Sequence, residues 1–451
     1  MNPVKIEVLI NFMENPVVMG HKNIILISSM LLLFTFTSAF GDQGIAIRAG
    51  HILTISDNPI ENGIILIKGG KIEALGQNVV LPEDVRLIDA NDKFVIPGLI
   101  DAQSRLFVMD SELDESRTIA PELNILDAID PFIKEYREVL AQGVTAVCVA
   151  PGSHGLIGGR SAVLKLNGSK NIDRMVLKAD ATVKAAVGMS TGNTSSSLAR
   201  LEHYSSIREA LIATKVYMQT KEKADREMAE YNRKKAEYEK KDSGKETEKK
   251  EKPKRPARFR SSPASDVLAQ VLRKEIPLQV EAHRVTDILN VLRLADEFGF
   301  TLILDKCTEG YLIADEIARR KASVIVGPVS TSFVDMPRLE YRNHDMSNAS
   351  ILSKNGIKTA LGVSGRDGAS SKFITLAAAM AAANGMDKDA ALRAITLTPA
   401  EMFGVADRIG SLQVGKDADL VILNGHPLDT QTRVEMVLIE GKVVFERKSQ
   451  Q

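Results

Sequence analysis

Short segments of alternating apolar and polar residues mark both ends of the chain. Near the N-terminus, Gly, Asn and Asp separate them, and they cover residues 45–48, 51–55, 63–68, 71–75 and 85–89. Such alternation is typical of half-buried β-strands, and the separating residues suit hairpin turns. The C-terminal end repeats the pattern at 419–423, 434–439 and 442–446. We therefore expect one small β-sandwich built from both chain ends, over residues 42–95 and 405–451.

The middle of the chain alternates strand-like runs with helix-like runs. The strand-like runs cover 94–100, 145–149, 175–177, 181–187, 278–281, 301–304, 323–327 and 359–362. Helical patterns between them include 284–298, 310–320, 370–384 and 388–396. This alternation favours a parallel sheet, and an α/β fold with a (β/α)8 TIM barrel over residues 96–404 is its most economical closure. In such a barrel, functional residues lie where strands end and loops begin.

An apolar run near the N-terminus predicts export. Residues 24–39 are predominantly apolar, follow Lys22 and end at small residues, Ala39 and Gly41. The run is short for a bilayer span, which needs about 20 residues. We interpret residues 1–41 as a secretory signal peptide, with an uncleaved membrane anchor as the alternative. A periplasmic or secreted protein is therefore expected.

Residues 220–262 form a charged insertion. Lys, Glu, Asp, Arg and Ala dominate it, and Tyr231 and Tyr238 lie on one helical face. The part up to Lys241 predicts a solvated helix with ion pairs between residues one turn apart, and the part through Pro253 and Pro256 predicts a disordered linker. An inert solvated insertion is the simplest interpretation, and a partner-docking surface or a lid is the alternative.

Composition and charge narrow the classes of function. The chain carries 58 basic and 58 acidic residues, so its net charge indicates no nucleic-acid partner. A hydrophobic share of 44% is ordinary for a soluble globular protein. Two cysteines, Cys148 and Cys307, are too few for a disulfide framework. We expect two buried thiols, with a single bridge as the alternative.

The most informative motif is Val95-Ile-Pro-Gly-Leu-Ile-Asp101-Ala-Gln103-Ser-Arg105. It resembles the first barrel strand of the metal-dependent amidohydrolases, where Pro-Gly is followed by Asp-Ala-His-x-His. The resemblance is to the secreted imidazolonepropionase-like or prolidase-like branch, and it covers roughly residues 45–447. Further segments that resemble this family are 143–159 with its glycine-rich loop, 277–284, 303–311, 360–365, 396–400 and, most specifically, 410–420.

This resemblance implies a β-sandwich joined to a (β/α)8 barrel and hydrolysis of C–N bonds in non-peptide or dipeptide amides. It also implies one or two divalent metal ions such as zinc, which polarise the scissile carbonyl and lower the pKa of a bound water. In the family, the ligands come from the first, fourth, fifth, sixth and eighth strands, and the eighth-strand Asp is also the general base. The corresponding positions here are Gln103, Arg105, Lys184, Glu281, Lys306 and Ser364.

Most of these positions no longer carry metal ligands. An amide binds divalent metals poorly, and a guanidinium cannot bind them. Arg105 and Lys306 would place two positive charges where a metal ion should lie, and both would repel it. We expect Glu281 to pair with Arg105 or Lys306, which would replace the charge of the metal. Lys184 resembles a lysine that some members carboxylate and is expected to stay an ordinary amine, and Ser364 is a poor base.

Other side chains offer a rebuilt site. Asp367 lies three residues past Ser364, so a shift of one turn would return a carboxylate to the barrel mouth, and these two are the candidate catalytic residues. Further candidates for metal binding are Glu309, His154, His203 and His344. The candidate ligand-binding residues are His154, His283, Arg105, Lys306, Glu309 and Tyr311.

Two functions stay open from the sequence. The first is a non-catalytic, exported relative of the amidohydrolases, a pseudoenzyme without a metal cofactor. It would bind a small amide-like or anionic ligand at the barrel mouth, or pair with a second copy or with an active relative. The second is an active hydrolase of cyclic amides or dipeptides with an atypical metal site.

Overall fold

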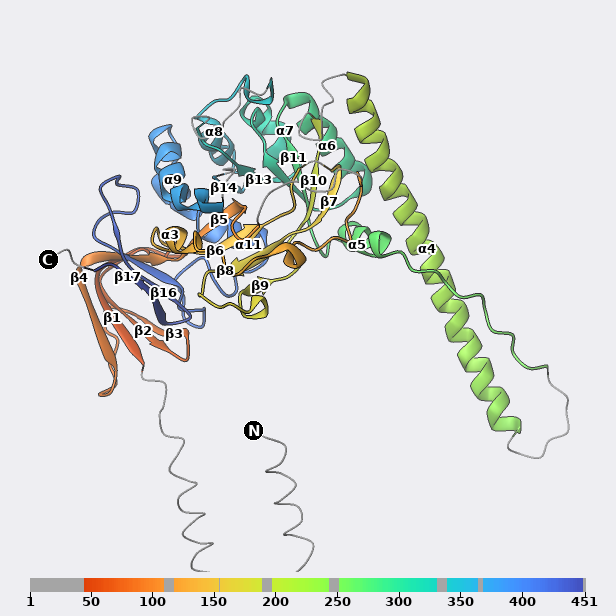
Figure 1. Cartoon of the computed structure of the whole chain (residues 1–451), viewed down its shortest axis with the longest axis horizontal. Helices are drawn as coiled ribbons and strands as arrows, with labels where there is room; N and C mark the ends of the chain where they lie inside the picture. The colour runs from red at the N-terminus through yellow and green to blue at the C-terminus, as the bar shows by residue number, and fades with distance from the viewer. Residues whose placement is uncertain are drawn as a thin grey trace, which may run out of the picture.

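The computed structural model describes residues 44–108, 117–153, 155–188, 197–242, 251–330, 339–363 and 368–448. Figure 1 shows a curved sheet at one end, a body of strands and helices in the middle, and a long helical arm at the other end. The predicted signal peptide lies outside the described residues. Within the described ranges, no helix is both long enough and apolar enough to cross a membrane.

The two ends of the chain build one seven-stranded sheet. Its strands are β1 (Ile45–Ile52), β2 (Ile60–Lys68), β3 (Lys71–Gly76), β4 (Arg86–Pro97), β15 (Leu420–Leu423), β16 (Val434–Ile439) and β17 (Lys442–Glu446). They follow the order β17-β16-β15-β4-β1-β2-β3. β4 joins the halves, because it pairs in parallel with β1 and antiparallel with β15.

This sheet folds back on itself. Gly70 and Gly441 lie at the tips of the β2–β3 and β16–β17 hairpins, and a Cβ atom on Gly441 would lie 3.3 Å from the Cα atom of Gly70. Their φ values of 77° and 71° suit tight hairpin turns. One apolar core inside the curve includes Ile47, Ile65, Ile72, Val95, Leu420 and Leu438. Strand hydrogen bonds thus join both chain ends in one curved sheet, and the predicted division into a sandwich stays a prediction.

The strands of the body form two further sheets. They are β5 (Leu99–Ser104), β6 (Val144–Val149), β7 (Ile157–Arg160), β8 (Ala162–Lys165), β9 (Val176–Lys178), β10 (Val183–Ala186), β11 (Leu278–Ala282), β12 (Leu302–Lys306), β13 (Ser323–Val326) and β14 (Thr359–Leu361). The orders are β14-β13-β12-β11-β10-β7 and β5-β6-β8-β9. Strands β10 to β14 run parallel, as do β5 and β6.

β7 and β8 differ from the sequence-based expectation. β7 begins in the glycine-rich loop of the family resemblance and β8 follows that loop, and the pattern predicts no strand at either place. They are separated by Ser161 alone and run antiparallel to β10 and β6, so one short segment links the two sheets. The α/β content with parallel strands is confirmed. Among the described residues, strand hydrogen bonds form these two sheets and not one closed ring.

Alternate residues of the body strands share one apolar interior. Ile100, Cys148, Val163, Ile303 and Ala360 come from both sheets and pack in one cluster, which residues 400–409 complete. The surrounding helices are α3 (Tyr136–Leu140), α5 (Pro263–Leu272), α6 (Val285–Phe298), α7 (Ala314–Arg319), α8 (Asn348–Lys354), α9 (Ile374–Ala383), α10 (Lys388–Arg393) and α11 (Leu397–Met402). Short 3-10 turns cover Ile125–Ala128, Ile172–Arg174, Gly310–Ile313, Leu339–Tyr341 and Gly368–Phe373.

Both cysteines are free and buried, so the expectation of two buried thiols is confirmed. Burial raises the pKa of the Cys148 thiol to about 12, and burial also raises the pKa of Cys307. Because the thiolate is the reactive form, neither cysteine is a nucleophile at neutral pH.

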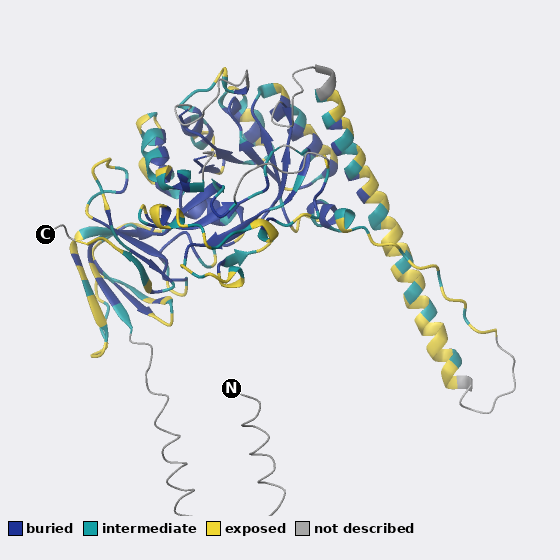
Figure 2. Cartoon of the chain, viewed as in Figure 1, coloured by how far each residue is buried: buried dark blue, intermediate teal, exposed yellow. Residues whose placement is uncertain are grey.

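A 46-residue helix, α4 (Ser197–Asp242), forms the arm. It begins well before residue 220, where the charged composition starts, because Ile207 and Leu211 are buried apolar residues that pack on the body. Its distal half is exposed, as Figure 2 shows. That half carries the predicted ion pairs one turn apart, Lys223–Glu227, Arg226–Glu222, Lys234–Glu230 and Lys235–Glu239.

The predicted linker lies partly outside the described residues, at 243–250. Residues 251–262 run back along the arm without regular secondary structure and lead into α5. Tyr217 on α4 fixes this junction, since its Oη atom donates to Oδ1 of Asp266 at 2.9 Å.

Candidate functional site

Three parallel strands bring charged side chains to the same end of the body. β10, β11 and β12 are neighbours, and their register pairs Lys184 with Gln279 and Glu281 with Asp305. Ile303 packs in the apolar interior, so Asp305, two residues later on the same strand, points to the same side. Lys184, Glu281 and Asp305 therefore meet inside the body at the strand ends.

Lys184 bridges two carboxylates. Its Nζ atom donates to Oδ2 of Asp305 and lies 3.5 Å from Oε2 of Glu281. All three side chains are buried. Gln103, near the end of β5, donates from Nε2 to Oδ1 of the same aspartate. We call these four residues the strand-end cluster.

Further donors hold the Asp305 carboxylate. Gln279 donates from Nε2 to Oδ2 at 2.9 Å, and the backbone N–H of Lys306 donates to Oδ1 at 2.8 Å. Thr182 donates from Oγ1 to Oε1 of Gln279 at 2.9 Å, which fixes the orientation of the amide. Both oxygens of the Asp305 carboxylate are thus engaged, Oδ1 by Gln103 and Lys306 and Oδ2 by Lys184 and Gln279.

Glu281 makes its own set of contacts. Its Oε1 atom lies 3.3 Å from Nε2 of His283, whose Nδ1 atom lies 2.8 Å from Oγ1 of Thr308. Ser153 donates from Oγ to Oε2. The Tyr341 ring packs edge-on against His283 with the centroids 4.9 Å apart. Glu281 and His283 therefore both reach the site, where they are in mutual contact.

The pKa shifts of the cluster follow from these contacts. Burial alone would raise the pKa of Glu281, but the hydrogen bond with His283 and the charge of Lys184 hold it well below the ordinary value of 4.5. Burial would lower the pKa of Lys184, yet the charges of Asp305 and Glu281 raise it above its ordinary value. Both Lys184 and Glu281 are therefore ionised at neutral pH.

Arg105 and Lys306 add two cations near the cluster. Burial lowers the pKa of Lys306, the charges of Glu281 and Asp305 oppose this shift, and the charges of Lys184 and Arg105 add to it. Within the described ranges, neither Arg105 nor Lys306 has an acidic side chain within ion-pair distance. The predicted pairing of Glu281 with one of these two is therefore corrected, because Lys184 on the neighbouring strand takes that place.

Asp101 joins the first and last strands of the body. Its Oδ2 atom accepts from Oγ of Ser371 at 2.6 Å, and its Oδ1 atom accepts from the backbone N–H groups of Gln103 at 3.0 Å and Val363 at 3.4 Å. Burial raises its pKa despite these hydrogen bonds. Asp101 therefore positions Gln103 relative to the end of β14.

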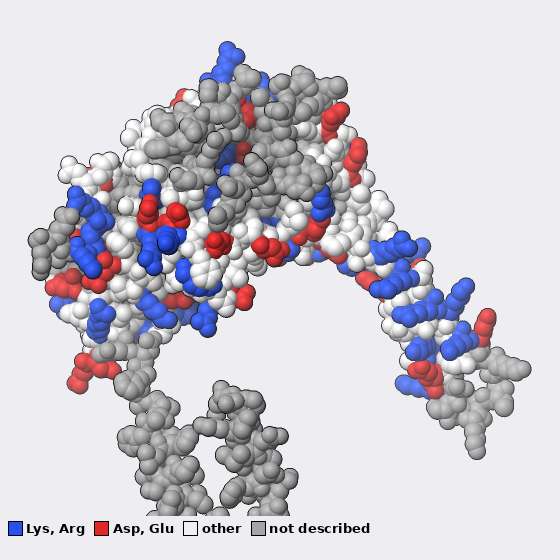
Figure 3. All heavy atoms as spheres, in the orientation of Figure 1, with Lys and Arg blue, Asp and Glu red and all other residues white. Residues whose placement is uncertain are grey.

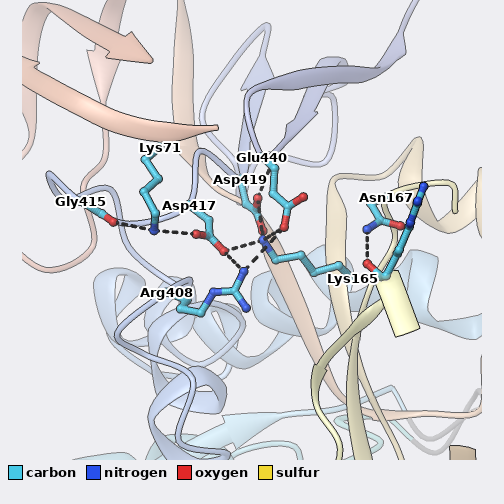
Figure 4. Close-up of polar contacts among 9 residues, drawn as sticks. Lys71, Lys165, Asn167, Arg408, Gly415, Asp417, Asp419 and Glu440 are labelled. Atoms are coloured by element: carbon cyan, nitrogen blue, oxygen red, sulfur yellow. Dashed lines mark hydrogen bonds and ion pairs between the residues drawn. The ribbon is translucent and has the colours of Figure 1, made fainter. Parts of the chain in front are cut away.

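A second buried ion cluster lies where the curved sheet meets the body (Figure 4). Nζ of Lys165 lies 2.7 Å from Oδ2 of Asp417, 3.0 Å from Oδ2 of Asp419 and 3.1 Å from Oε1 of Glu440. Arg408 pairs with Asp417 at 2.6 Å. A cavity of about 460 Å³ opens beside these residues, between the β2–β3 and β16–β17 hairpins. We call Lys165 and its three acidic partners the junction cluster.

Two of the predicted ligand-binding residues hold loops in place. Glu309 accepts from the N–H of Val285, the first residue of α6, at 2.7 Å and from Nδ2 of Asn343 at 2.8 Å. Tyr311 donates to the backbone oxygen of Asn343 at 3.0 Å. Both oxygens of the Glu309 carboxylate are thus engaged in anchoring the neighbouring segments.

The predicted histidines are separated in the structure. His203 is half-buried on α4, and His344 lies with Nε2 3.3 Å from the backbone oxygen of Pro328. His283 alone among the described candidate histidines contacts the strand-end cluster. His154, Ser364 and Asp367 lie outside the described residues.

Comparison with known proteins identifies this frame. Residues 94–444 match the model of the Amidohydrolase family, from the end of β4 through most of β17. The chain belongs to the amidohydrolase family. The α/β body with its parallel strands is thus the frame of a member of this family.

Individual proteins resemble the chain over most of its length. An amidohydrolase from Thermotoga maritima MSB8 is 30% identical, with a TM-score of 0.76 over 89% of this chain and 100% of that chain. A prolidase complexed with N-methylphosphonate-L-proline has a TM-score of 0.53 at 16% identity over 90% of this chain and 100% of that one, which shows the fold alone. Amidohydrolase tasK from Hapsidospora irregularis is 22% identical over 439 residues. The chain spans 41% of the length of that curated relative.

The strand ends of this amidohydrolase fit an ammonium better than a divalent metal ion. The described residues contain no group of three or more His, Cys, Asp and Glu side chains placed to hold a metal. The Lys184 ammonium already lies against Asp305 and Glu281, the carboxylates that a metal would need. Gln103 turns its amide nitrogen, a donor, toward Asp305.

Sequence reasoning missed several residues of this site. One signal for Asp305 was available in the sequence. It lies two residues after the apolar Ile303, so on a strand it faces the same side as that buried residue. Gln279 has the same spacing from Glu281. Ser153 gave no signal, since only the fold brings its loop to Glu281.

Proposed function

We propose that this member of the amidohydrolase family binds a small anionic or amide-like ligand at its strand ends and does not carry out metal-dependent hydrolysis. The observation that carries the proposal is the Lys184 ammonium between Asp305 and Glu281. A buried ammonium paired with two carboxylates neutralises them without a metal.

The electrostatics oppose a metal ion at this place. A divalent ion about 4 Å from a fixed ammonium is repelled by about 8 kcal/mol at an effective dielectric constant near 20. Arg105 and Lys306 add to this repulsion. The raised pKa of Lys184 also keeps its amine protonated at neutral pH, which supports the expectation that it is not carboxylated.

The ligand class follows from the two basic side chains near the cluster that are outside its ion pairs. Lys184 is shared by Asp305 and Glu281, whereas Arg105 and Lys306 have no acid at ion-pair distance among the described side chains. A ligand carboxylate would form ion pairs with Arg105 and Lys306, and a neighbouring amide would exchange hydrogen bonds with Gln103. N-acetylglycine carries both groups and is a suitable probe.

An active hydrolase of cyclic amides or dipeptides is the second candidate. The contact between Glu281 and His283 favours it, because both side chains are metal ligands in other proteins. Such an enzyme would need ligands from beyond the described residues, and Ser364 and Asp367 are the positions to examine.

Metal content separates the two functions. The protein is purified in excess zinc or manganese, dialysed, and its metal content measured by mass spectrometry. We expect less than one-tenth of an equivalent and unchanged thermal stability after chelation. One tightly bound equivalent per chain would overturn the proposal. In parallel, calorimetry with N-acetylglycine should show binding that is lost in R105Q/K306Q, and identical binding by that variant would contradict the ligand assignment.

Export and association also belong to this proposal. We propose that residues 1–41 are removed during export, which N-terminal sequencing of the mature protein would test. We further propose that the chain associates with a second copy or with an active relative. Light scattering of the purified protein tests the association with a second copy, and a monomer at all concentrations would contradict that association.

A further inference from the structure

Residues 251–262 form an extended strap along the arm. Its partly buried residues recur at every third position, Pro253, Pro256, Phe259 and Ser262. A repeat of three is the period of a polyproline II helix. The Phe259 ring packs on Tyr217 of α4 with the centroids 5.2 Å apart, and the N–H of Ser262 donates to Oη of Tyr217 at 3.3 Å. One side of the strap therefore faces the helix.

The other side of the strap is an unbalanced row of cations. It carries five exposed basic residues and one acid, and the basic residues are Lys252, Lys254, Arg255, Arg258 and Arg260. Within the part of the chain that the structure describes, none of the five is at ion-pair distance from an acidic side chain. Residues 252–260 would span about 25 Å in a polyproline II conformation.

The helix beneath the strap is different. Residues 221–240 of α4 contain seven basic and six acidic residues, and four ion pairs one turn apart link them. The net positive charge of the arm is therefore concentrated on the strap. Figure 3 shows Lys and Arg side chains spread along the arm, which projects away from the body.

The shape of this row selects the kind of partner. Small anions would contact one or two of the cations, whereas a broad anionic surface would contact all five. The arm stands clear of the body, so a large flat partner can approach without collision. The contacts of Phe259 and Ser262 with Tyr217 hold the row in place before binding, which lowers the entropy cost of docking.

We propose that the strap is a docking surface for the anionic phospholipid headgroups of a membrane surface. Each basic residue close to an anionic leaflet strengthens binding by about fivefold, and the attraction weakens as salt screens it. The five cations together are sufficient for reversible attachment of the whole chain.

The test is sedimentation of the full chain with lipid vesicles. Vesicles of phosphatidylcholine alone are compared with vesicles of equal parts phosphatidylcholine and phosphatidylglycerol. The variant K254E/R255E/R258E reverses three strap cations and leaves Pro253, Phe259 and Tyr217 in place. The matched control, R48E/K68E/K442E, makes the same change in net charge at exposed positions of the curved sheet.

We expect the wild type and the control to bind the phosphatidylglycerol vesicles at low salt. The strap variant should lose at least about a hundredfold in partition coefficient, because three contributions of about fivefold are removed and the new carboxylates are repelled by the anionic leaflet. Insertion of the apolar run 24–39 into the bilayer would persist on phosphatidylcholine and in the strap variant, so it does not imitate this result. Circular dichroism should be the same for all three proteins.

Three outcomes would overturn the proposal. One is equal binding by the wild type and the strap variant. The second is an equal loss in both variants, which would show that total charge matters and not the strap. The third is binding to duplex DNA but not to the anionic vesicles, which would assign the strap to a different class of polyanion.

Discussion

The strand-end cluster and the junction cluster both place a buried lysine among carboxylates, but they lie in different segments of the family resemblance. Lys165 contacts Asp417 and Asp419, which lie in the segment that most specifically resembles the family, at 410–420. Lys184 contacts Asp305 and Glu281, which lie in or next to segments where the sequence predicts replaced metal ligands. The comparison separates the shared frame of the family, which carries the junction cluster, from the strand ends, where we propose that an ammonium takes the place of a metal ion.

The two clusters also differ in how their carboxylates are supported. Burial raises the pKa of Asp419, which depends mainly on Lys165 and on the N–H of Glu440. Asp305, by contrast, accepts from Gln103 and Gln279 as well as from Lys184. Removal of the lysine should therefore harm the junction more than the strand ends.

The largest effect is expected from K165M. Methionine is close in volume to lysine but leaves three acidic groups around an apolar side chain, and breaking a buried ion pair from one side costs about 4 kcal/mol. Urea unfolding measures the loss. Lys71 also pairs with Asp417 and provides the control. K71M should cost less than about 1 kcal/mol, because the Lys71 side chain is 55% exposed. Equal losses in both variants would show that burial does not set the strength of this cluster.

A smaller loss, about 3 kcal/mol, is expected from K184M. Asp305 would keep two amide donors, and Glu281 would keep His283 and Ser153. The same unfolding experiment measures it. If K184M instead binds zinc with one equivalent per chain, the ammonium will be shown to be what excludes the metal. A gain in stability would contradict the account of the strand-end cluster.

The pH dependence of E281Q should show an effect of about 2 kcal/mol. The folded-state pKa of Glu281 lies well below the ordinary value of 4.5, so the carboxylate stabilises the fold fully above that value. The contribution is lost as the pH falls through the folded-state pKa. The stability difference between wild type and E281Q should therefore stay constant above about pH 5 and shrink as the pH falls from there through the folded-state pKa. A constant difference over that range would mean that Glu281 is not stabilised in its ionised form.

The smallest effect is expected from restoring family ligands. Q103H/R105H/S364D should not hydrolyse dipeptides or hydantoin measurably faster than the wild type. Lys184, Glu281 and Lys306 still occupy the remaining ligand positions that the family resemblance implies. Hydrolysis assays with added zinc test this. Activity well above the wild type in the zinc-loaded variant would show that the other strand-end positions do not block the site.

Local patterns predicted the elements of the fold well where one periodicity dominates. The predicted helix at 284–298 corresponds to α6 (Val285–Phe298), and the predicted strand at 278–281 corresponds to β11 (Leu278–Ala282). The pattern failed at β7 and β8, since Gly158 and Gly159 resemble a loop and only pairing with β10 and β6 makes the segment a strand. It also placed the start of α4 too late. The prediction followed the charged composition, whereas the helix begins earlier, with buried Ile207 and Leu211 packed on the body.

The sequence alone determined the family frame and predicted that Gln103 and Arg105 stand at the first-strand ligand positions and that Lys184 and Lys306 lie near the strand ends. Residue types and spacing are sufficient for these conclusions. The tertiary structure decided which charge neutralises which, because Lys184 and Asp305 are 121 residues apart in the chain. Their contact depends on strand order and register, and these are set by the packing of the whole body and not by any local segment.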